Sequence, residues 1–321
     1  MQFVSSPAVI RLQSPVLKRK RSCSTTCMIA SSRVSTTDKQ WANFAKNTGT
    51  WEGSLTTYDG SAVEQDRQPT VLFIEAEGGA ANDLPFALQL LLRRPSKLSD
   101  VRQIYMRGED LSMRGMVFDD NRGSMCCGSN LAPARVIEQN LNFDGGRARL
   151  VTQYNFDGNG ISKFSLFRER PSEQKRTQDI KDTQVDAHVV NSDAPWLTDR
   201  DTSSTLDQGL ESFAGNWKAT EVLFIRANGN TENVQGSSEL ELRMEDASTK
   251  GTRQVKLGDG TILSTFGGGV ASRVSQKAPH NGEDSQIELL LLRGSTLQQI
   301  RREYRNGRFM GSHFCFHKRS C

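Results

Sequence analysis

The chain has 321 residues, which at roughly 150 residues a domain is enough for about two domains. Hydrophobic residues make up 36% of it and charged residues 24%, and no run approaches the ~20 apolar residues of a spanning helix. We therefore expect no transmembrane segment. Six cysteines without a regular spacing exclude a disulfide scaffold and favour a reduced, intracellular protein.

The net charge of +4 is concentrated at one end of the chain. Residues 1–37 hold six basic side chains and no acidic one, and the rest has 35 basic against 37 acidic side chains. Proteins that read nucleic acids gather many cations on one surface. We therefore expect no nucleic-acid partner.

Residues 1–37 have the composition of a disordered transit peptide, with eight Ser and four Thr beside the six cations. A secretory signal needs a continuous apolar segment, whereas polar and charged residues interrupt 8–16. Small residues at 27–31 suit cleavage in a plastid, so we expect a chloroplast protein, in the stroma or peripheral to the thylakoid. A mitochondrial leader is one alternative, and a nuclear-import or phosphate-binding patch at 18–21 is another.

Turns of the type aromatic-Asp-Gly organise the first half of the remaining chain. They occur at 58–60, 143–145 and 156–158, and Asp-Gly tolerates the positive φ angles of tight hairpins. The segments 136–143, 148–156 and 161–167 are therefore predicted to be consecutive antiparallel strands. In the middle strand, alternation gives an apolar face of Ala148, Leu150, Thr152, Tyr154 and Phe156, and a polar face of Arg147, Arg149, Gln153 and Asn155.

The later half of the chain shows the same pattern of strands separated by Gly-containing turns. Asn-Gly and Asp-Gly turns separate strands predicted at 218–225, 238–244, 287–293, 299–304 and 308–317. Few segments show the apolar spacing of a helix, so the protein is predicted to be mainly β.

A short motif occurs twice. Gly49-Thr50-Trp51 recurs as Gly215-Asn216-Trp217, 166 residues later, each time after a short helical segment (39–46 and 206–213) and before a strand. The repeat predicts a first barrel at 38–170, a polar linker at 171–205 and a second barrel at 206–321. A closed meander of about eight strands encloses either side chains or one small ligand.

The Gly-x-Trp motif after a short helix is the feature through which the chain resembles lipocalin-like, or calycin, barrels. In addition, residues 41–58 resemble an uncharacterised family of two-barrel lipocalin-like proteins from cyanobacteria and plastid-bearing organisms, and the likeness extends over most of 40–318. Phycobiliprotein lyases look like more distant relatives. The resemblance implies an all-β fold of two tandem antiparallel barrels, each opened by a short helix, and a hydrophobic ligand or pigment.

In lipocalin-like barrels a late-strand arginine commonly packs over the opening tryptophan. The resemblance therefore predicts that Arg168 packs over Trp51 and that Arg302 or Arg305 packs over Trp217. These contacts, like Gly49 and Gly215, are expected to be structural.

Arginines and tyrosines on the predicted strands are the candidates for ligand contacts. Their side chains suit a ligand carboxylate, such as a tetrapyrrole propionate or a fatty-acid head group. The candidates are Arg102, Tyr105, Arg107, Arg114, Arg147, Arg149 and Tyr154. The alternative is that these side chains face water on the outside of the barrel.

No metal, cofactor or catalytic residue is predicted. His313, Cys315 and His317 share one face of a strand, but residues i and i+4 lie ~13 Å apart along a strand, too far for one zinc ion. Adjacent Cys126 and Cys127 point to opposite sides of a strand and lack Cys-x-x-Cys spacing.

Nucleotide and hydrolase patterns are missing from the sequence as well. The glycines at 267–269 and 78–79 fit neither the Rossmann nor the P-loop pattern, and Gly-x-Ser-x-Gly does not occur.

Three functions remain open. The first is a plastid protein that binds a tetrapyrrole, carotenoid or lipid in a barrel lumen. The second is a bilin lyase or isomerase, with Glu109, Asp110 and Glu303 available as acid or base. The third is an assembly factor with filled barrels and a plastid protein partner.

Overall fold

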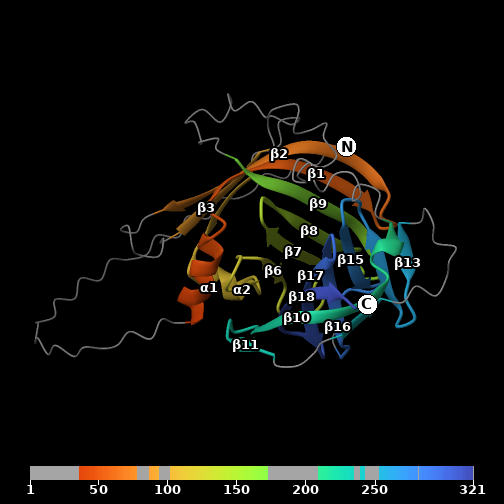
Figure 1. The fold of residues 1–321 in the computed structure, drawn as a ribbon. Helices are drawn as coiled ribbons and strands as arrows, with labels where there is room; N and C mark the ends of the chain where they lie inside the picture. Colours follow the sequence, from red (N-terminus) through yellow and green to blue (C-terminus); the bar gives the residue numbers. More distant parts are fainter. Residues whose placement is uncertain are drawn as a thin grey trace, which may run out of the picture. The chain divides into compact units, whose positions relative to one another are not determined.

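A computed structural model describes residues 36–77, 87–93, 102–172, 209–234, 239–242, 253–280 and 282–320. The expected leader at 1–37 and the expected linker at 171–205 lie almost wholly outside the described residues. The described chain is mainly β, as predicted, with two antiparallel sheets (Figure 1).

The first sheet follows helix α1 (Thr36–Ala45). Its strands are β1 (Gly49–Asp59), β2 (Glu64–Glu77), β3 (Ala87–Arg93), β4 (Arg102–Met106), β5 (Val117–Phe118), β6 (Met125–Gly128), β7 (Val136–Phe143), β8 (Gly146–Tyr154) and β9 (Ile161–Ser172). Helix α2 (Gly108–Met113) lies between β4 and β5 in the sequence and beside α1 in space (Figure 1).

The second sheet follows a single 3-10 turn, η2 (Leu210–Ser212). Its strands are β10 (Gly215–Arg226), β11 (Thr231–Asn233), β12 (Glu239–Leu242), β13 (Gln254–Lys256), β14 (Thr261–Thr265), β15 (Val270–Ser275), β16 (Ser285–Arg293), β17 (Thr296–Arg305) and β18 (Arg308–Arg319).

Both sheets are meanders whose first and last strands pair. The order β4-β3-β2-β1-β9-β8-β7-β6-β5 joins β1 to β9, and the second sheet likewise joins β10 to β18. Tight turns with positive φ connect neighbouring strands, as at Gly145 (φ 87°) and at Asn306 and Gly307 (φ 48° and 73°). No pairing joins β4 to β5 or β12 to β13, so within the described residues neither sheet closes into a full barrel.

Three apolar clusters hold the sheets. The largest lies between the two sheets and combines side chains of β7, β8 and β9 with side chains of β15, β16, β17 and β18. The other two lie on the opposite face of each sheet, which we call its inner face. The first inner cluster contains Trp41, Phe44 and Phe118, and the second contains Trp217, Leu290 and Leu297.

The two faces of β8 differ from the simplest expectation. Its apolar residues Ala148, Leu150 and Tyr154 do not fill a lumen but pack between the sheets. The arginines of the other face line a cavity instead of facing bulk water. Phe156, predicted on the apolar face, is 85% exposed because the strand ends at Tyr154.

The two Gly-x-Trp motifs have the same local geometry. Gly49 and Gly215 have φ angles of 128° and 130°, which favour glycine. In each copy the indole Nε1 donates to a backbone oxygen four residues earlier at 2.9 Å, Asn47 for Trp51 and Phe213 for Trp217. Each tryptophan packs at its own inner cluster.

Candidate functional site

A small cavity opens on the inner face of the first sheet. Its volume is about 40 Å³, space for roughly three water molecules. Apolar side chains from α1, β2, β3, β5 and β6 form one wall, and polar side chains of β7 and β8 form the other. The lining residues are Phe44, Asn47, Leu72, Ile74, Leu90, Phe118, Met125, Glu138, Asn140, Arg147 and Arg149.

Two arginines and two glutamates form a buried ion-pair network at this cavity. Arg147 Nε lies 2.7 Å from Glu169 Oε2, and Arg149 Nη2 lies 3.2 Å from Glu169 Oε1. Arg149 Nη1 also contacts Glu138 at 3.2 Å. Burial alone raises the pKa of Glu169, but the two guanidinium groups outweigh it and hold that pKa below its usual value. Glu169 is therefore ionised, and both arginines share its charge.

Three polar atoms of the cavity wall have no hydrogen-bond partner. They are Arg147 Nη2, Arg149 Nε and Asn140 Oδ1, and all three are buried. Asn140 and Arg149 are paired directly across β7 and β8, and Arg147 is two residues from Arg149 on the same face of β8, so the three side chains belong to one wall of the cavity. A buried donor or acceptor without a partner costs about 1–3 kcal/mol, which a bound polar group offsets.

The arginine over Trp51 is Arg147, not Arg168 as predicted. The Arg147 guanidinium carbon lies 4.0 Å from the ring centroid. Arg168 belongs to the other face of β9, and its Nη2 donates to the backbone oxygens of Phe266 and Gly267, at 2.7 and 3.0 Å. An arginine from a late strand does pack over the tryptophan, but it comes from β8. The alternation of side chains along β9 directs Arg168 to the second sheet.

The prediction for Trp217 is wrong in the same way. Arg319 packs over its ring at 4.8 Å. Arg302 is fully buried and reaches the first sheet, where its guanidinium donates to the backbone oxygens of Gly115, Gly128 and Ser129. Arg305 is instead bonded to Glu303 at 2.9 Å, near the end of β17.

The remaining predicted ligand residues do not gather at the cavity. Tyr154 lies between the sheets and donates to the backbone oxygen of Ser275 at 3.2 Å. Tyr105 is 55% exposed, and Arg107 and Arg114 flank α2 on the surface. Arg102 is in β4, but its side chain lies outside the described residues. Of the six candidates whose side chains the structure describes, only Arg147 and Arg149 line the cavity.

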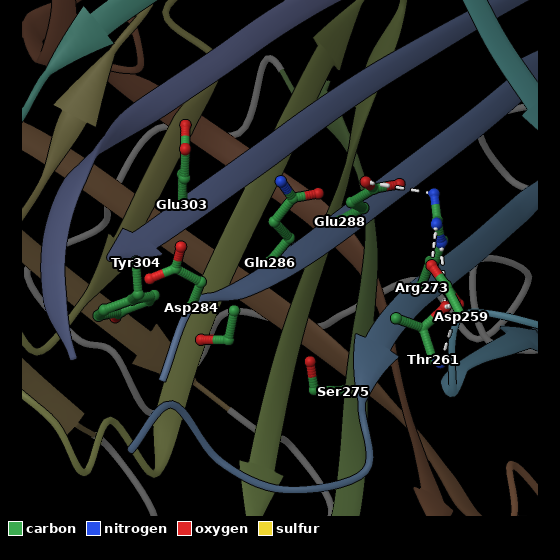
Figure 2. A pocket seen from close by; sticks show the side chains of 10 residues that line it. Asp259, Thr261, Arg273, Ser275, Asp284, Gln286, Glu288, Glu303 and Tyr304 are labelled. Atoms are coloured by element: carbon green, nitrogen blue, oxygen red, sulfur yellow. Dashed lines mark hydrogen bonds and ion pairs between the residues drawn. The ribbon is translucent and has the colours of Figure 1, made fainter. Parts of the chain in front are cut away.

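The second sheet has a larger and more polar cavity, about 260 Å³ in volume, on its inner face. It is lined by Asp259, Thr261, Arg273, Ser275, Asp284, Ser285, Gln286, Glu288, Glu303 and Tyr304. Figure 2 shows Glu288, Arg273 and Asp259 linked in a chain along one side. Of these residues, sequence reasoning singled out only Glu303. The sequence feature that could have indicated this cavity is Glu288, a charged residue inside the apolar run Ile287–Leu292.

The three thiols in the described residues, those of Cys126, Cys127 and Cys315, are unreactive in their surroundings. Cys126 contributes to the cluster between the sheets and Cys127 packs on the first inner cluster, so the two point to opposite faces. Burial raises the pKa of both thiols, that of Cys127 to about 12, and likewise raises that of Cys315 to about 12. At neutral pH these cysteines carry no reactive thiolate.

The candidate acids and bases are engaged in structural bonds. Asp110 accepts from the backbone N–H of Arg107 at 2.7 Å in a capping box, and Glu109 is exposed on the same helix. His313 Nε2 lies 3.3 Å from Glu303, and this contact holds the pKa of Glu303 down to about 2. Within the described part of the chain, no group of three or more His, Cys, Asp or Glu has the geometry of a metal site.

Comparison with known proteins finds a family model and solved structures that are similar to this chain. Residues 37–174 match a family model described as a domain of unknown function, DUF3598, N-terminal. The first sheet lies within the matched residues and is similar to that domain. The likeness to an uncharacterised family with cyanobacterial members is therefore confirmed.

A solved structure extends the likeness to both sheets. A DUF3598 protein of unknown function from Nostoc punctiforme has 18% sequence identity and a TM-score of 0.63, over 88% of this chain and 99% of that chain. At this identity the two proteins share a fold, and their function does not transfer.

Another match is weaker. An S-type phycobiliprotein lyase from Guillardia theta matches with 13% identity and a TM-score of 0.27, over 41% of this chain and 92% of that chain. A comparison with curated proteins finds no match. Among the described residues, the helices are all too short or too polar to cross a bilayer.

Proposed function

We propose that the protein is a non-catalytic binding protein that holds the carboxylate of an amphipathic small molecule on the inner face of the first sheet. The observation that carries the proposal is the pair of unpartnered donors, Arg147 Nη2 and Arg149 Nε, beside an apolar wall. A carboxylate accepts two such N–H groups at once.

The shape of the cavity indicates which part of the ligand is inside. About 40 Å³ accommodates a head group but not a whole lipid or pigment. Leu72, Ile74 and Leu90 continue the apolar wall along β2 and β3. An apolar tail lying on these strands extends the contact, so a fatty acid or a tetrapyrrole with propionates suits the site better than a carotenoid without a charged group.

The tightness of the cavity also supports a second candidate, an assembly factor with filled barrels and a protein partner. The inner cluster of the second sheet is packed as well, with Trp217, Leu290 and Leu297 each 0% exposed. A lyase or isomerase has less support, because the described carboxylates of the site form ion pairs and do not stand free as acids or bases.

A ligand panel tests the proposal. Laurate and biliverdin carry carboxylates, whereas dodecanol and β-carotene match them in apolar character without one. We expect the full chain to bind the carboxylate members at least tenfold more tightly, measured by calorimetry and by quenching of tryptophan fluorescence, since Trp51 packs on Arg147. Equal binding of laurate and dodecanol, or no binding at all, contradicts the proposal, and the latter favours the assembly factor.

A conservative variant isolates the donor. Arg149→Lys keeps the charge for Glu138 and Glu169 but removes Nε, so we expect about tenfold weaker laurate binding. The control is Arg170→Lys, which alters an ion pair with Glu52 on the same sheet but does not line the cavity. An equal loss in both variants contradicts a role for Arg149.

The chloroplast location is part of the same proposal. Its support is the acid-free, Ser-rich composition of residues 1–37. A fluorescent protein fused after residue 37 is expected to enter chloroplasts, and the same fusion without residues 1–37 to remain outside. Entry into mitochondria, or into neither organelle, refutes this part.

A further inference from the structure

The inner face of the second sheet changes from apolar to charged along its strands. The register of β16, β17 and β18 places Leu292, Leu297 and His317 in one row and Leu290, Gln299 and Cys315 in the next. The following row contains Glu288, Arg301 and His313. The apolar rows belong to the cluster around Trp217 or adjoin it, and the 260 Å³ cavity begins at the charged row.

Glu288 is the deepest charged group of this cavity. It is only 1% exposed, and Figure 2 shows its carboxylate at the cavity wall. Its Oε1 lies 3.6 Å from Arg273 Nη1, a long ion pair. Its Oε2 is buried and has no hydrogen-bond partner. A buried carboxylate oxygen without a donor is costly unless a ligand or ordered water supplies one.

Neither of the nearby cations, Arg273 and Arg301, is a hydrogen-bond donor to this oxygen among the described residues. Arg273 bonds Asp259 and Thr261 as well as Glu288, and Arg305 bonds Glu303. Arg301 is opposite Glu288 across β16 and β17, but it forms no ion pair within 4.0 Å among the described residues, its buried Nε has no hydrogen-bond partner there, and it does not line the cavity. Within the described part of the chain, the one ion pair of Glu288 is thus the long one with Arg273.

The lining as a whole carries an excess of acceptors. Asp259, Asp284, Glu288 and Glu303 are on the cavity wall, against the single cation Arg273. Ser275, Thr261 and Gln286 add neutral polar groups, and the hydroxyl of Ser285 has no partner. Asp284 and Gln286 are exposed, so the rim is accessible from solvent while Glu288 is not.

We propose that this cavity binds a small organic cation, an ammonium- or guanidinium-bearing molecule whose N–H groups donate to Glu288 Oε2 and to the carboxylates at the rim. The charged end enters first, because the unpartnered acceptor is at the bottom of the cavity. This site differs in position and in charge from the carboxylate site of the first sheet, and it does not depend on that proposal.

Calorimetry of the full chain with putrescine and spermidine tests the inference. Butanediol and succinate are the matched probes, one neutral and one anionic, with the same number of backbone carbons as putrescine. We expect putrescine and spermidine to bind, butanediol to bind at least tenfold more weakly and succinate not to bind. Succinate binding in preference to putrescine means an anion site at Arg273 and Arg301, and equal binding of butanediol means a neutral hydroxyl site; either result, or no binding, overturns the proposal.

Two variants locate the site. Glu288→Gln keeps the shape of the side chain and removes its charge, and we expect at least tenfold weaker putrescine binding. Gln286→Lys places an ammonium at an exposed rim position that tolerates a longer side chain, so it is expected to reduce binding similarly without affecting folding. Glu109→Gln, an exposed change on α2, is the control. Unchanged putrescine binding in both Glu288→Gln and Gln286→Lys refutes the site.

Discussion

The first strand of each sheet carries the same Gly-x-Trp motif, but the inner faces of the two sheets differ in where their charged residues lie. Trp51 is half-buried and packs under a buried arginine, Arg147, whereas Trp217 is 0% exposed and is surrounded by leucines. The arginine near Trp217, Arg319, comes from the exposed end of β18. The first sheet therefore places a buried arginine beside its tryptophan, whereas the second sheet has only an arginine from its exposed end there and places Glu288, its buried inner-face carboxylate, several rows away.

This difference shows that the Gly-x-Trp motif determines backbone geometry and not binding chemistry. The same φ angles and the same indole hydrogen bond occur in both copies. What each tryptophan contacts is decided by residues on strands far along the chain, such as Arg147 and Leu297. Four predictions sharpen the comparison.

The largest expected effect is at the ion-pair network of the first sheet. Arg147→Met leaves Glu169, which is 0% exposed, with only the Arg149 contact at 3.2 Å. We expect a loss of about 3–5 kcal/mol in the free energy of unfolding, measured in urea. Arg273→Met, at the more exposed network of the second sheet, is expected to cost much less. A similar cost at both positions removes the distinction between the two inner faces.

The tryptophans give the next effect. Trp217→Leu removes a fully buried side chain from a packed cluster, and we expect a loss of about 3 kcal/mol. Trp51→Leu is expected to cost less, because its ring is partly exposed. Denaturant unfolding of both variants is the measurement. A larger loss at Trp51 shows that stacking under Arg147 outweighs burial.

The first strands of the two sheets, β1 and β10, differ at one position where β1 has a glycine. A Cβ at Gly53 would lie 1.8 Å from the backbone oxygen of Arg168, so Gly53→Ala forces β1 and β9 apart, at a cost of about 2 kcal/mol. The corresponding residue of the second copy is Ala219, where the register of β10 and β18 shifts between Ala219 and Glu221. Ala219→Gly is therefore expected to change the melting temperature little, whereas Gly53→Ala lowers it clearly. Equal tolerance at the two positions rules out this account.

The smallest effect is a pH dependence specific to the second sheet. Burial, with a contribution from Arg301, lowers the pKa of His317 from 6.5 to about 4. The unfolded chain then binds a proton that the folded chain does not, so this stability is complete above pH 6.5 and declines as the pH falls towards 4. The part of this loss that falls between pH 6.5 and 4.5 is roughly 2 kcal/mol.

His317→Gln serves as the matched variant. We expect its melting temperature to change less than that of the native chain between pH 6.5 and 4.5. Carboxylates with lowered pKa values, such as Glu303 and Asp259, begin to protonate in the unfolded chain near the lower end of this window, but they do so equally in the native chain and in His317→Gln, so the difference between the two slopes isolates His317. An unchanged slope in His317→Gln assigns the dependence to another group.

The elements of this fold were largely predictable because their signals are local. Strands β7, β8, β16, β17 and β18 are where turn chemistry and alternation predict them, and the helix before Trp51 is α1. Predictions that required long-range partners failed. Arg168 and Arg302 are on the predicted strands, yet each reaches across to the other sheet.

The candidate site was predictable only in part for the same reason. Arg147 and Arg149 were recognised as a polar face, but Glu169 was not recognised as their shared partner, because it is 20 residues or more away in the sequence. The second cavity was missed, since its acidic residues come from four different segments.

By itself, the sequence determined a mainly β chain, a motif used twice and the period of each strand, since turns and alternation depend only on neighbouring residues. It left open which face of each strand is covered. Tertiary structure decided that, because the largest apolar cluster forms between the two sheets and so assigns the polar faces to the inside. Contact between segments that are far apart in the chain is what turned those polar faces into two cavities of different charge.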